Sequence, residues 1–149
     1  MKIIDFLREW AVNYVKNKDI FTKTIVDIEQ RERELTVRHK HKEHKYFMDP
    51  FLEHYKNDLK TLKDDSHASL ICFNTKENFN SLLESWNEFV AYRHLSIIFL
   101  NPYSAAQKVW VIFPYTHNNI ADPDSLKLGL QTMFEQVEVI DRKRAEEVS

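Results

Sequence analysis

The chain has 149 residues, an ordinary length for one domain, and 43% of them are hydrophobic. This apolar content, with 13% aromatic residues, excludes the disordered class, because it is enough to build a packed core. The net charge of −2 excludes a bulk electrostatic attraction to nucleic acid or to an anionic membrane. Any anion binding must therefore come from a local patch.

The chain has a single cysteine, Cys72, and a single glycine, Gly129. One cysteine excludes an intrachain disulfide, and one glycine excludes the glycine-rich loops that cradle phosphates, so we expect no nucleotide cofactor. No apolar run reaches the ~18–20 residues that span a bilayer, and the first residues lack the pattern of a secretory signal. These features predict a cytoplasmic protein with no membrane partner.

Hydrophobic periodicity and turn residues predict the first elements along the chain. An apolar face at helical spacing predicts a helix over 3–16. β-branched residues predict a strand over 22–28, and a second strand is predicted to run unbroken over 35–46. The short charged connection between them favours an antiparallel hairpin. Asp49-Pro50 then predicts the start of a helix, with proline in its first turn.

Buried strands alternate with helices in the second half of the chain. Nearly all-apolar runs over 68–73 and 95–100 are typical of central strands covered on both faces. Asn74-Thr75-Lys76-Glu77 resembles a capping box and predicts a helix that continues to about residue 93. A strand over 109–113 is expected to run antiparallel to the one before it, because their connection is short.

A helix that starts near Asp122 and a strand over 137–140 complete the predicted elements, and 142–149 is predicted to be a charged C-terminal tail. The resulting order is α-β-β-α-β-α-β-β-α-β. We interpret it as one α+β domain over 1–141, with helices packed on a mixed sheet of five or six strands.

The densest chemical feature is the run from Arg38 to Lys45, which alternates basic residues with histidines. In an unbroken strand, His39, His41 and Glu43 would point to one face. Two imidazoles and a carboxylate suit zinc or iron, so one hypothesis is a divalent metal site at these three residues. The alternative is a solvated, lysine-rich strand that protects a sheet edge.

A second hypothesis concerns Asp27, Glu43 and Lys45. An Asp on one strand and a Glu-x-Lys on the next resemble the pattern of magnesium-dependent nucleases of the restriction-endonuclease type. The two carboxylates would hold Mg²⁺ and the lysine would position the attacking water. The third strand that this pattern expects before the next helix is not evident in the sequence.

A third hypothesis is a local nucleic-acid patch. Residues 31–45 contain six Lys or Arg residues against three Glu residues. Arg38, Lys40 and Lys42 would contact phosphates, and an exposed Tyr46 or Phe47 would stack on a base.

Other polar residues are interpreted as structural. His54, His67 and His94 are isolated in the sequence, and each is expected at the surface or at a helix end. Asn74 and Asn101 follow two strands that are predicted to be parallel, and His117, in a polar loop, is expected at the opposite end of the sheet from them.

No nucleophile paired with a base by spacing is evident, and the aromatic content is high enough to serve an interface. The sequence therefore predicts a non-enzymatic binding or self-assembly module, with a homodimer as the expected oligomer. The nuclease and the nucleic-acid-binding module are the alternatives.

Overall fold

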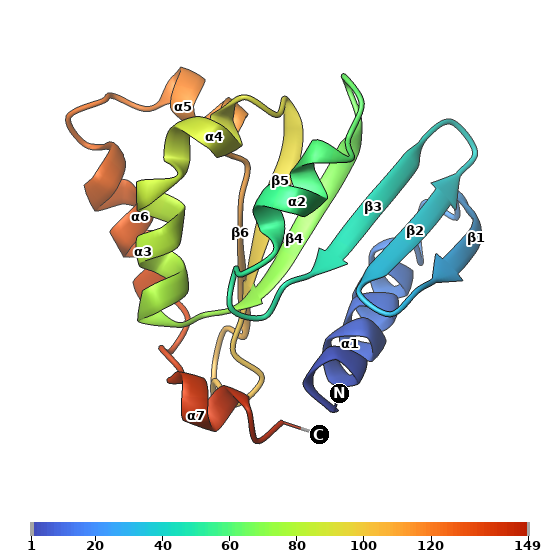
Figure 1. Cartoon of the computed structure of the whole chain (residues 1–149), viewed down its shortest axis with the longest axis horizontal. Coiled ribbons are helices and arrows are strands. Elements are labelled where there is room, and N and C mark those ends of the chain that lie inside the picture. Colours follow the sequence, from blue (N-terminus) through green and yellow to red (C-terminus); the bar gives the residue numbers. More distant parts are fainter. Residues whose placement is uncertain (1, 149) are drawn as a thin grey trace.

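The structure, a computed structural model, describes residues 2–148. It contains a six-stranded sheet with helices on both faces, and the strands follow one another across the sheet in chain order (Figure 1). The predicted fold class, α+β with a mixed sheet, is confirmed. The elements are α1 (Lys2–Lys18), β1 (Ile25–Gln30), β2 (Glu34–His39), β3 (Glu43–Met48), α2 (Tyr55–Lys60), β4 (His67–Phe73), α3 (Lys76–Glu84), α4 (Trp86–Val90), β5 (His94–Leu100), β6 (Val109–Ile112), α5 (Pro114–Ile120), α6 (Leu126–Glu135) and α7 (Arg142–Ala145).

Strand directions divide the sheet into two parts. β1, β2 and β3 form an antiparallel meander, and β3, β4 and β5 run parallel to one another. β6 returns antiparallel to β5, as the short connection predicts. β4 and β5 are interior strands, and their apolar side chains are buried on both faces of the sheet, as predicted.

Each face of the sheet has its own core. On one face, which we call the α1 face, Leu7, Ala11 and Val15 of α1 recur every four residues and pack on β2 and β3. On the opposite face, α2, α3, α4 and α6 cover the sheet, and residues such as Phe89 and Phe134 are buried there. No helix within residues 2–148 is both long enough and apolar enough to cross a membrane.

The prediction of one strand over 35–46 is wrong, because this segment forms two strands joined by a turn. β2 ends at His39 and β3 begins at Glu43, with a backbone hydrogen bond of 2.8 Å from the His39 amide to the Lys42 carbonyl. The turn reverses the chain, so Glu43 pairs with Arg38 and points to the same face as that residue. The structure therefore contains the third strand that was not evident in the sequence.

The strand predicted over 137–140 is absent. Its backbone carbonyls accept hydrogen bonds from amide side chains instead: the Asn74 side chain donates to the Val137 carbonyl (3.0 Å) and the Asn101 side chain to the Glu138 carbonyl (2.8 Å). The segment predicted as a charged tail contains α7, and Val148 is buried on the α1 face.

Three helices also differ from the prediction. α2 begins at Tyr55 rather than near Asp49, because the Asp49 carboxylate accepts two backbone hydrogen bonds in the preceding turn. The helix predicted to reach residue 93 is broken at Ser85, whose hydroxyl bonds the Tyr55 hydroxyl at 2.7 Å. The predicted polar loop with His117 is α5, which lies after β6 at the end of the sheet opposite to Asn74.

Candidate functional site

A cavity of 630 Å³, which we call the histidine cavity, opens on the α1 face at the amino-terminal ends of the parallel strands. Five of the seven histidines of the chain line it. It is lined by Val15, Lys18, Asp19, Thr22, Thr24, His39, His41, Lys42, His44, Tyr46, His67, Arg93, His94, Phe113 and Thr116.

Three of these histidines form a row across the sheet, the imidazole row: His44 on β3, His67 on β4 and His94 on β5. Each is the direct Cα partner of the next, so the parallel pairing alone brings them together on one face. The His67 and His94 rings stack with centroids 4.3 Å apart and planes 14° apart. His44 stacks on Tyr46 in the same way, with centroids 4.3 Å apart.

Below the row, His44 begins a short chain of buried hydrogen bonds. Its Nε2 atom lies 2.8 Å from the Ser69 hydroxyl, which lies 2.6 Å from the Ser96 hydroxyl. A serine beside a histidine is the beginning of a nucleophilic site. However, Ser69 is only 1% exposed, so a substrate cannot reach its hydroxyl, and we assign these bonds a structural role.

Three histidines of the cavity, His39, His44 and His67, are in surroundings that favour the neutral imidazole. Burial, followed by the positive charge of Lys42, lowers the pKa of the His44 imidazole to about 3. Burial also lowers the pKa of the His39 and His67 imidazoles, with Lys42 as the next cause for His39 and His94 for His67. Neutral imidazoles can donate a hydrogen bond from one nitrogen and accept at the other.

Asp19 is the one acidic residue among those that line the cavity, and both of its carboxylate oxygens accept hydrogen bonds from the neighbouring loop. They accept hydrogen bonds from the Thr24 and Ile25 amides and from the Thr22 and Thr24 hydroxyls, at 2.9–3.1 Å. Burial alone would raise its pKa, but these bonds lower the pKa of Asp19 to about 2. Its role is to close the loop between α1 and β1.

Three exposed cations stand at the rim: Lys18 at the end of α1, Lys42 in the β2–β3 turn and Arg93 just before β5. Within residues 2–148, none of the three forms an ion pair, although ten ion pairs occur elsewhere in the protein. The cavity thus combines cations that form no ion pair with imidazole rings that can form hydrogen bonds.

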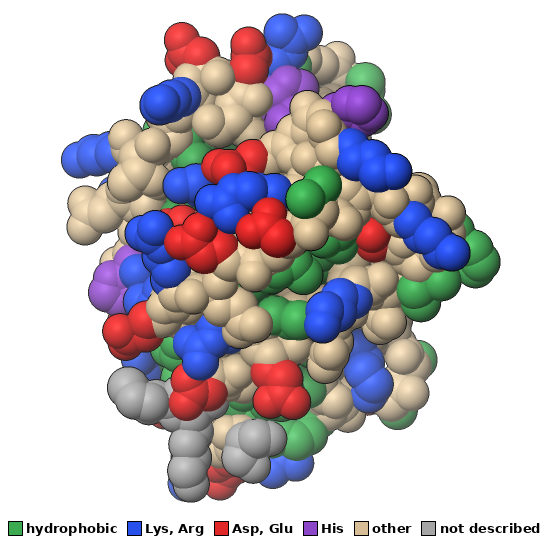
Figure 2. Space-filling model, turned by 90° about the vertical axis from the view of Figure 1, so that its right-hand side faces the viewer, with side chains coloured by type: hydrophobic (Ala, Val, Ile, Leu, Met, Phe, Trp, Pro, Cys, Tyr) green, Lys and Arg blue, Asp and Glu red, His purple; other side chains and the backbone are tan. Residues whose placement is uncertain are grey.

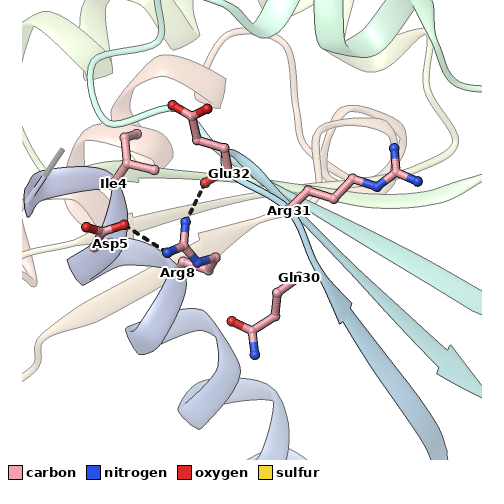
Figure 3. Close-up of a pocket in the computed structure, with 6 residues that line it drawn as sticks. All are labelled: Ile4, Asp5, Arg8, Gln30, Arg31 and Glu32. Carbon is pink, nitrogen blue, oxygen red and sulfur yellow. Dashed lines mark hydrogen bonds and ion pairs between the residues drawn. The ribbon is translucent and has the colours of Figure 1, made fainter.

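A second pocket, of 570 Å³, lies between α1 and the β1–β2 turn. Its cations are paired, unlike those of the histidine cavity. Arg8 bonds both the Asp5 carboxylate and the Glu32 carbonyl at 2.8 Å (Figure 3), and Arg31 bonds Glu29 at 3.0 Å. We therefore take the histidine cavity as the candidate site.

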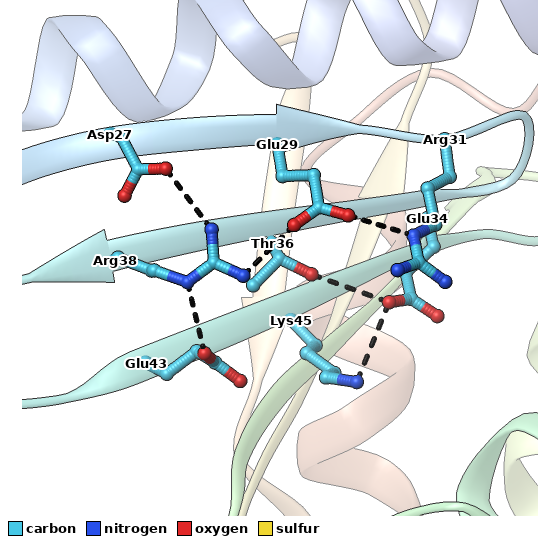
Figure 4. Close-up of polar contacts among 8 residues, drawn as sticks. All are labelled: Asp27, Glu29, Arg31, Glu34, Thr36, Arg38, Glu43 and Lys45. Atoms are coloured by element: carbon cyan, nitrogen blue, oxygen red, sulfur yellow. Dashed lines mark hydrogen bonds and ion pairs between the residues drawn. The ribbon is translucent and has the colours of Figure 1, made fainter.

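The residues of the nuclease hypothesis lie on the other face of the sheet. Asp27 and Glu43 both point to the Arg38 guanidinium, at 3.0 and 3.4 Å, and Glu29 bonds the same group at 2.9 Å (Figure 4). Lys45 pairs with Glu34 at 3.5 Å. Figure 2, which looks on to the β1 side of the molecule, shows basic and acidic side chains close together there. Arg38 thus occupies the position that a metal ion would need.

The residues of the metal hypothesis are divided between two places. His39 and His41 line the histidine cavity, whereas Glu43 lies on the opposite face of the sheet from His39 and pairs with Arg38. The turn between β2 and β3 causes this separation. Within residues 2–148, no three His, Cys, Asp or Glu side chains converge as a metal site.

The residues of the nucleic-acid hypothesis also lie in separate places. Lys42 and Tyr46 line the cavity, Lys40 is exposed in the β2–β3 turn, and Arg38 belongs to the ion pairs of the other face. The expectation that Tyr46 is exposed is wrong, because its exposed fraction is 5%. Burial raises its pKa to about 12.

No protein-family model, curated protein or solved structure matches the chain. Its function must therefore be inferred from the site itself.

Sequence reasoning missed His67, His94, Lys18 and Arg93. A signal for the two histidines is present, since each immediately precedes a predicted buried strand and these strands were expected to run parallel. Parallel neighbours with similar start positions bring their first residues together. Lys18 and Arg93 join the cavity from the end of α1 and from the segment before β5, and nothing local in the sequence connects them.

The magnesium hypothesis can be tested on the unmodified protein. Because Asp27, Glu29 and Glu43 share the Arg38 guanidinium, we expect millimolar Mg²⁺ to leave the thermal unfolding midpoint unchanged at constant ionic strength. The measurement is differential scanning fluorimetry with MgCl₂ against NaCl. A rise with Mg²⁺ that the Asp27→Asn variant abolishes would restore the nuclease hypothesis.

Proposed function

We propose that this protein is a binding domain that holds a phosphate-bearing ligand in the histidine cavity. The observation that carries the proposal is the presence of Lys18, Lys42 and Arg93 around one cavity, none of them in an ion pair within residues 2–148. Like charges placed together without a partner repel one another, and a bound anion removes that repulsion.

The chemistry of the cavity favours phosphate over a single carboxylate. A phosphate monoester carries a charge of about −1.5 to −2 at pH 7 and three strong acceptor oxygens. Three cations match that charge, and the Thr116 hydroxyl and the imidazole rings supply further donors. The Asp19 carboxylate is engaged by the loop that it closes, where it accepts hydrogen bonds from Thr22, Thr24 and Ile25.

A non-enzymatic role fits the same arrangement. The serine beside His44 is buried, and the described residues contain no convergent metal ligands. We therefore assign the cavity to binding.

Self-association is a separate expectation. The edge strand β1 carries a bulge between Ile25 and Asp27, and bulges at an edge work against pairing with a second copy. Such pairing would also bring acidic side chains of β1, Asp27 and Glu29, from two copies close together. Self-association is thus left outside the proposed function, and light scattering after size exclusion tests it.

Charge removal at the rim tests the proposal. We expect the triple variant Lys18→Gln, Lys42→Gln, Arg93→Gln to bind inorganic pyrophosphate at least about tenfold more weakly than the wild type, because each cation contributes a charge-assisted contact. Isothermal titration calorimetry at low salt measures the affinity.

The matched control removes the same charge elsewhere. Lys56, Lys60 and Lys127 are exposed and do not line the histidine cavity, so their triple glutamine variant should bind pyrophosphate like the wild type. Equal weakening in both triple variants would show that net charge, rather than the cavity, determines binding.

A further inference from the structure

Beside the histidine cavity, the loop between α1 and β1 presents an aromatic side chain to solvent. Phe21 is 94% exposed, the highest value among the exposed large apolar side chains of the described residues. It directly precedes Thr22, which lines the cavity. The Asp19 carboxylate holds the loop after Phe21 in place through its bonds to Thr22, Thr24 and Ile25. The ring is therefore presented by an ordered loop.

Basic residues from two segments meet around this loop. The Lys40 amide donates to the Thr24 carbonyl at 2.9 Å, and His39 Nδ1 lies 2.8 Å from the Thr24 hydroxyl. These bonds join the β2–β3 turn, which carries Lys40 and Lys42, to the loop that carries Lys23. Lys18 at the end of α1 adds a further positive charge at the cavity rim.

We infer that this surface binds single-stranded nucleic acid, with a phosphate group in the histidine cavity and a base stacked on Phe21. The inference rests on the proposed function, because it names the ligand to which the phosphate belongs. Aromatic side chains beside a positively charged groove are the elements with which proteins bind single strands without sequence preference. Bases within a duplex are already stacked on one another and do not offer a free face to such a ring.

The shape of the surface favours a nucleic-acid strand over a lipid bilayer. A flat bilayer would contact the protruding loop, but it would not follow the surface into a cavity whose far side carries Arg93, His67 and His94. A single strand is flexible, with one charge per nucleotide, so it can place one phosphate in the cavity and others against Lys23 and Lys40.

Fluorescence anisotropy with a short 3′-labelled, 5′-phosphorylated oligothymidylate tests the inference. We expect the Phe21→Ala variant to bind about tenfold more weakly than the wild type, because one stacking contact is lost. The Phe21→Trp variant should retain the affinity. Ile20→Ala is the matched control, since Ile20 is also exposed in this loop and should change the affinity less than about twofold. Phe21 is almost fully exposed, so its replacement leaves the fold intact.

The outcomes separate this inference from the proposed function. If pyrophosphate binds as proposed but the oligonucleotide does not, the inference is wrong and the proposed function stands. If neither ligand binds, both are wrong. Equal affinity of Phe21→Ala and wild type for the oligonucleotide would reject stacking at this residue. If vesicles of phosphatidylserine and phosphatidylcholine bind in a Phe21-dependent way and the oligonucleotide does not, the surface is a lipid-binding surface and the inference is overturned.

Discussion

Replacing Asn74 with alanine should lower the free energy of unfolding by about 3–4 kcal/mol, because it leaves several buried polar groups without partners. The Asn74 side chain is fully buried at the end of β4. Its Nδ2 atom donates to the Val137 carbonyl at 3.0 Å, and its Oδ1 atom accepts from Trp110 Nε1 at 2.8 Å. Longer bonds of 3.3 Å reach the carbonyls of Phe134 and Glu138.

The loss of unfolding free energy in Asn74→Ala has two contributions, which a double-mutant cycle can separate. One is the orphaned Trp110 N–H, and the other is the loss of the bonds to the segment after α6. The Trp110→Phe substitution removes the N–H, so Asn74→Ala should cost about 1–2 kcal/mol less in that background. Urea unfolding followed by circular dichroism gives the four free energies. Additive costs would show that the bond to Trp110 contributes nothing to stability.

Asn119→Ala is the control for Asn74→Ala. Asn119 is exposed in α5, and its replacement should change the stability by no more than about 0.5 kcal/mol. A loss below about 1 kcal/mol for Asn74→Ala would mean that water replaces the side chain in the core, and it would contradict a structural role for the Asn74 hydrogen bonds.

The prediction of the fold succeeded where one local signal dominates. β4 and β5 are short, continuous apolar runs with both faces buried, and such runs are typical of strands covered on both faces. The pairing of β6 with β5 followed from loop length alone. In both cases the deciding information lies within a few neighbouring residues.

The turn between β2 and β3 was missed because its residues carry no turn signal. Lys40, His41 and Lys42 include none of the Gly, Pro, Asn or Asp residues that mark reversals, and polar alternation continues through them. Its consequence is large, since a reversal changes which side chains share a face. Glu43 thereby joins Arg38, and His44 joins His39 on the α1 face.

The missing last strand has a different cause. The residues 137–140 have strand-like composition, but their backbone partners are the side chains of Asn74 and Asn101, which come from the ends of β4 and β5. Such long-range bonds between side chain and backbone leave no trace in local periodicity. The same holds for the rim of the histidine cavity, where Lys18, Lys42 and Arg93 come from three separate parts of the chain.

Acid should destabilise the folded protein through His44 before most carboxylates titrate. The pKa of His44 is lowered from 6.5 to about 3 in the folded state, first by burial and then by Lys42. Below pH 6.5 the unfolded chain binds a proton that the folded protein cannot bind, so the stability falls as the pH falls through this interval. Between about pH 7 and about pH 4.5, His44 alone should cost about 2–3 kcal/mol of unfolding free energy. His39 and His67, whose pKa values are also lowered, act in the same direction.

The His44→Gln variant isolates this effect, because glutamine can still bond Ser69 but does not titrate. Between about pH 7 and about pH 4.5, the unfolding free energy of this variant should fall by about 2–3 kcal/mol less than that of the wild type. Urea titration at several pH values measures both free energies. Asn119→Ala, at an exposed residue that does not titrate, should keep the slope of the wild type. The pKa of Asp19 is lowered from 3.8 to about 2 in the folded protein, so its titration affects stability at lower pH than that of His44. Parallel pH profiles for the wild type and His44→Gln would show that His44 takes up a proton in the folded state, and the cavity would then carry that additional positive charge in acid.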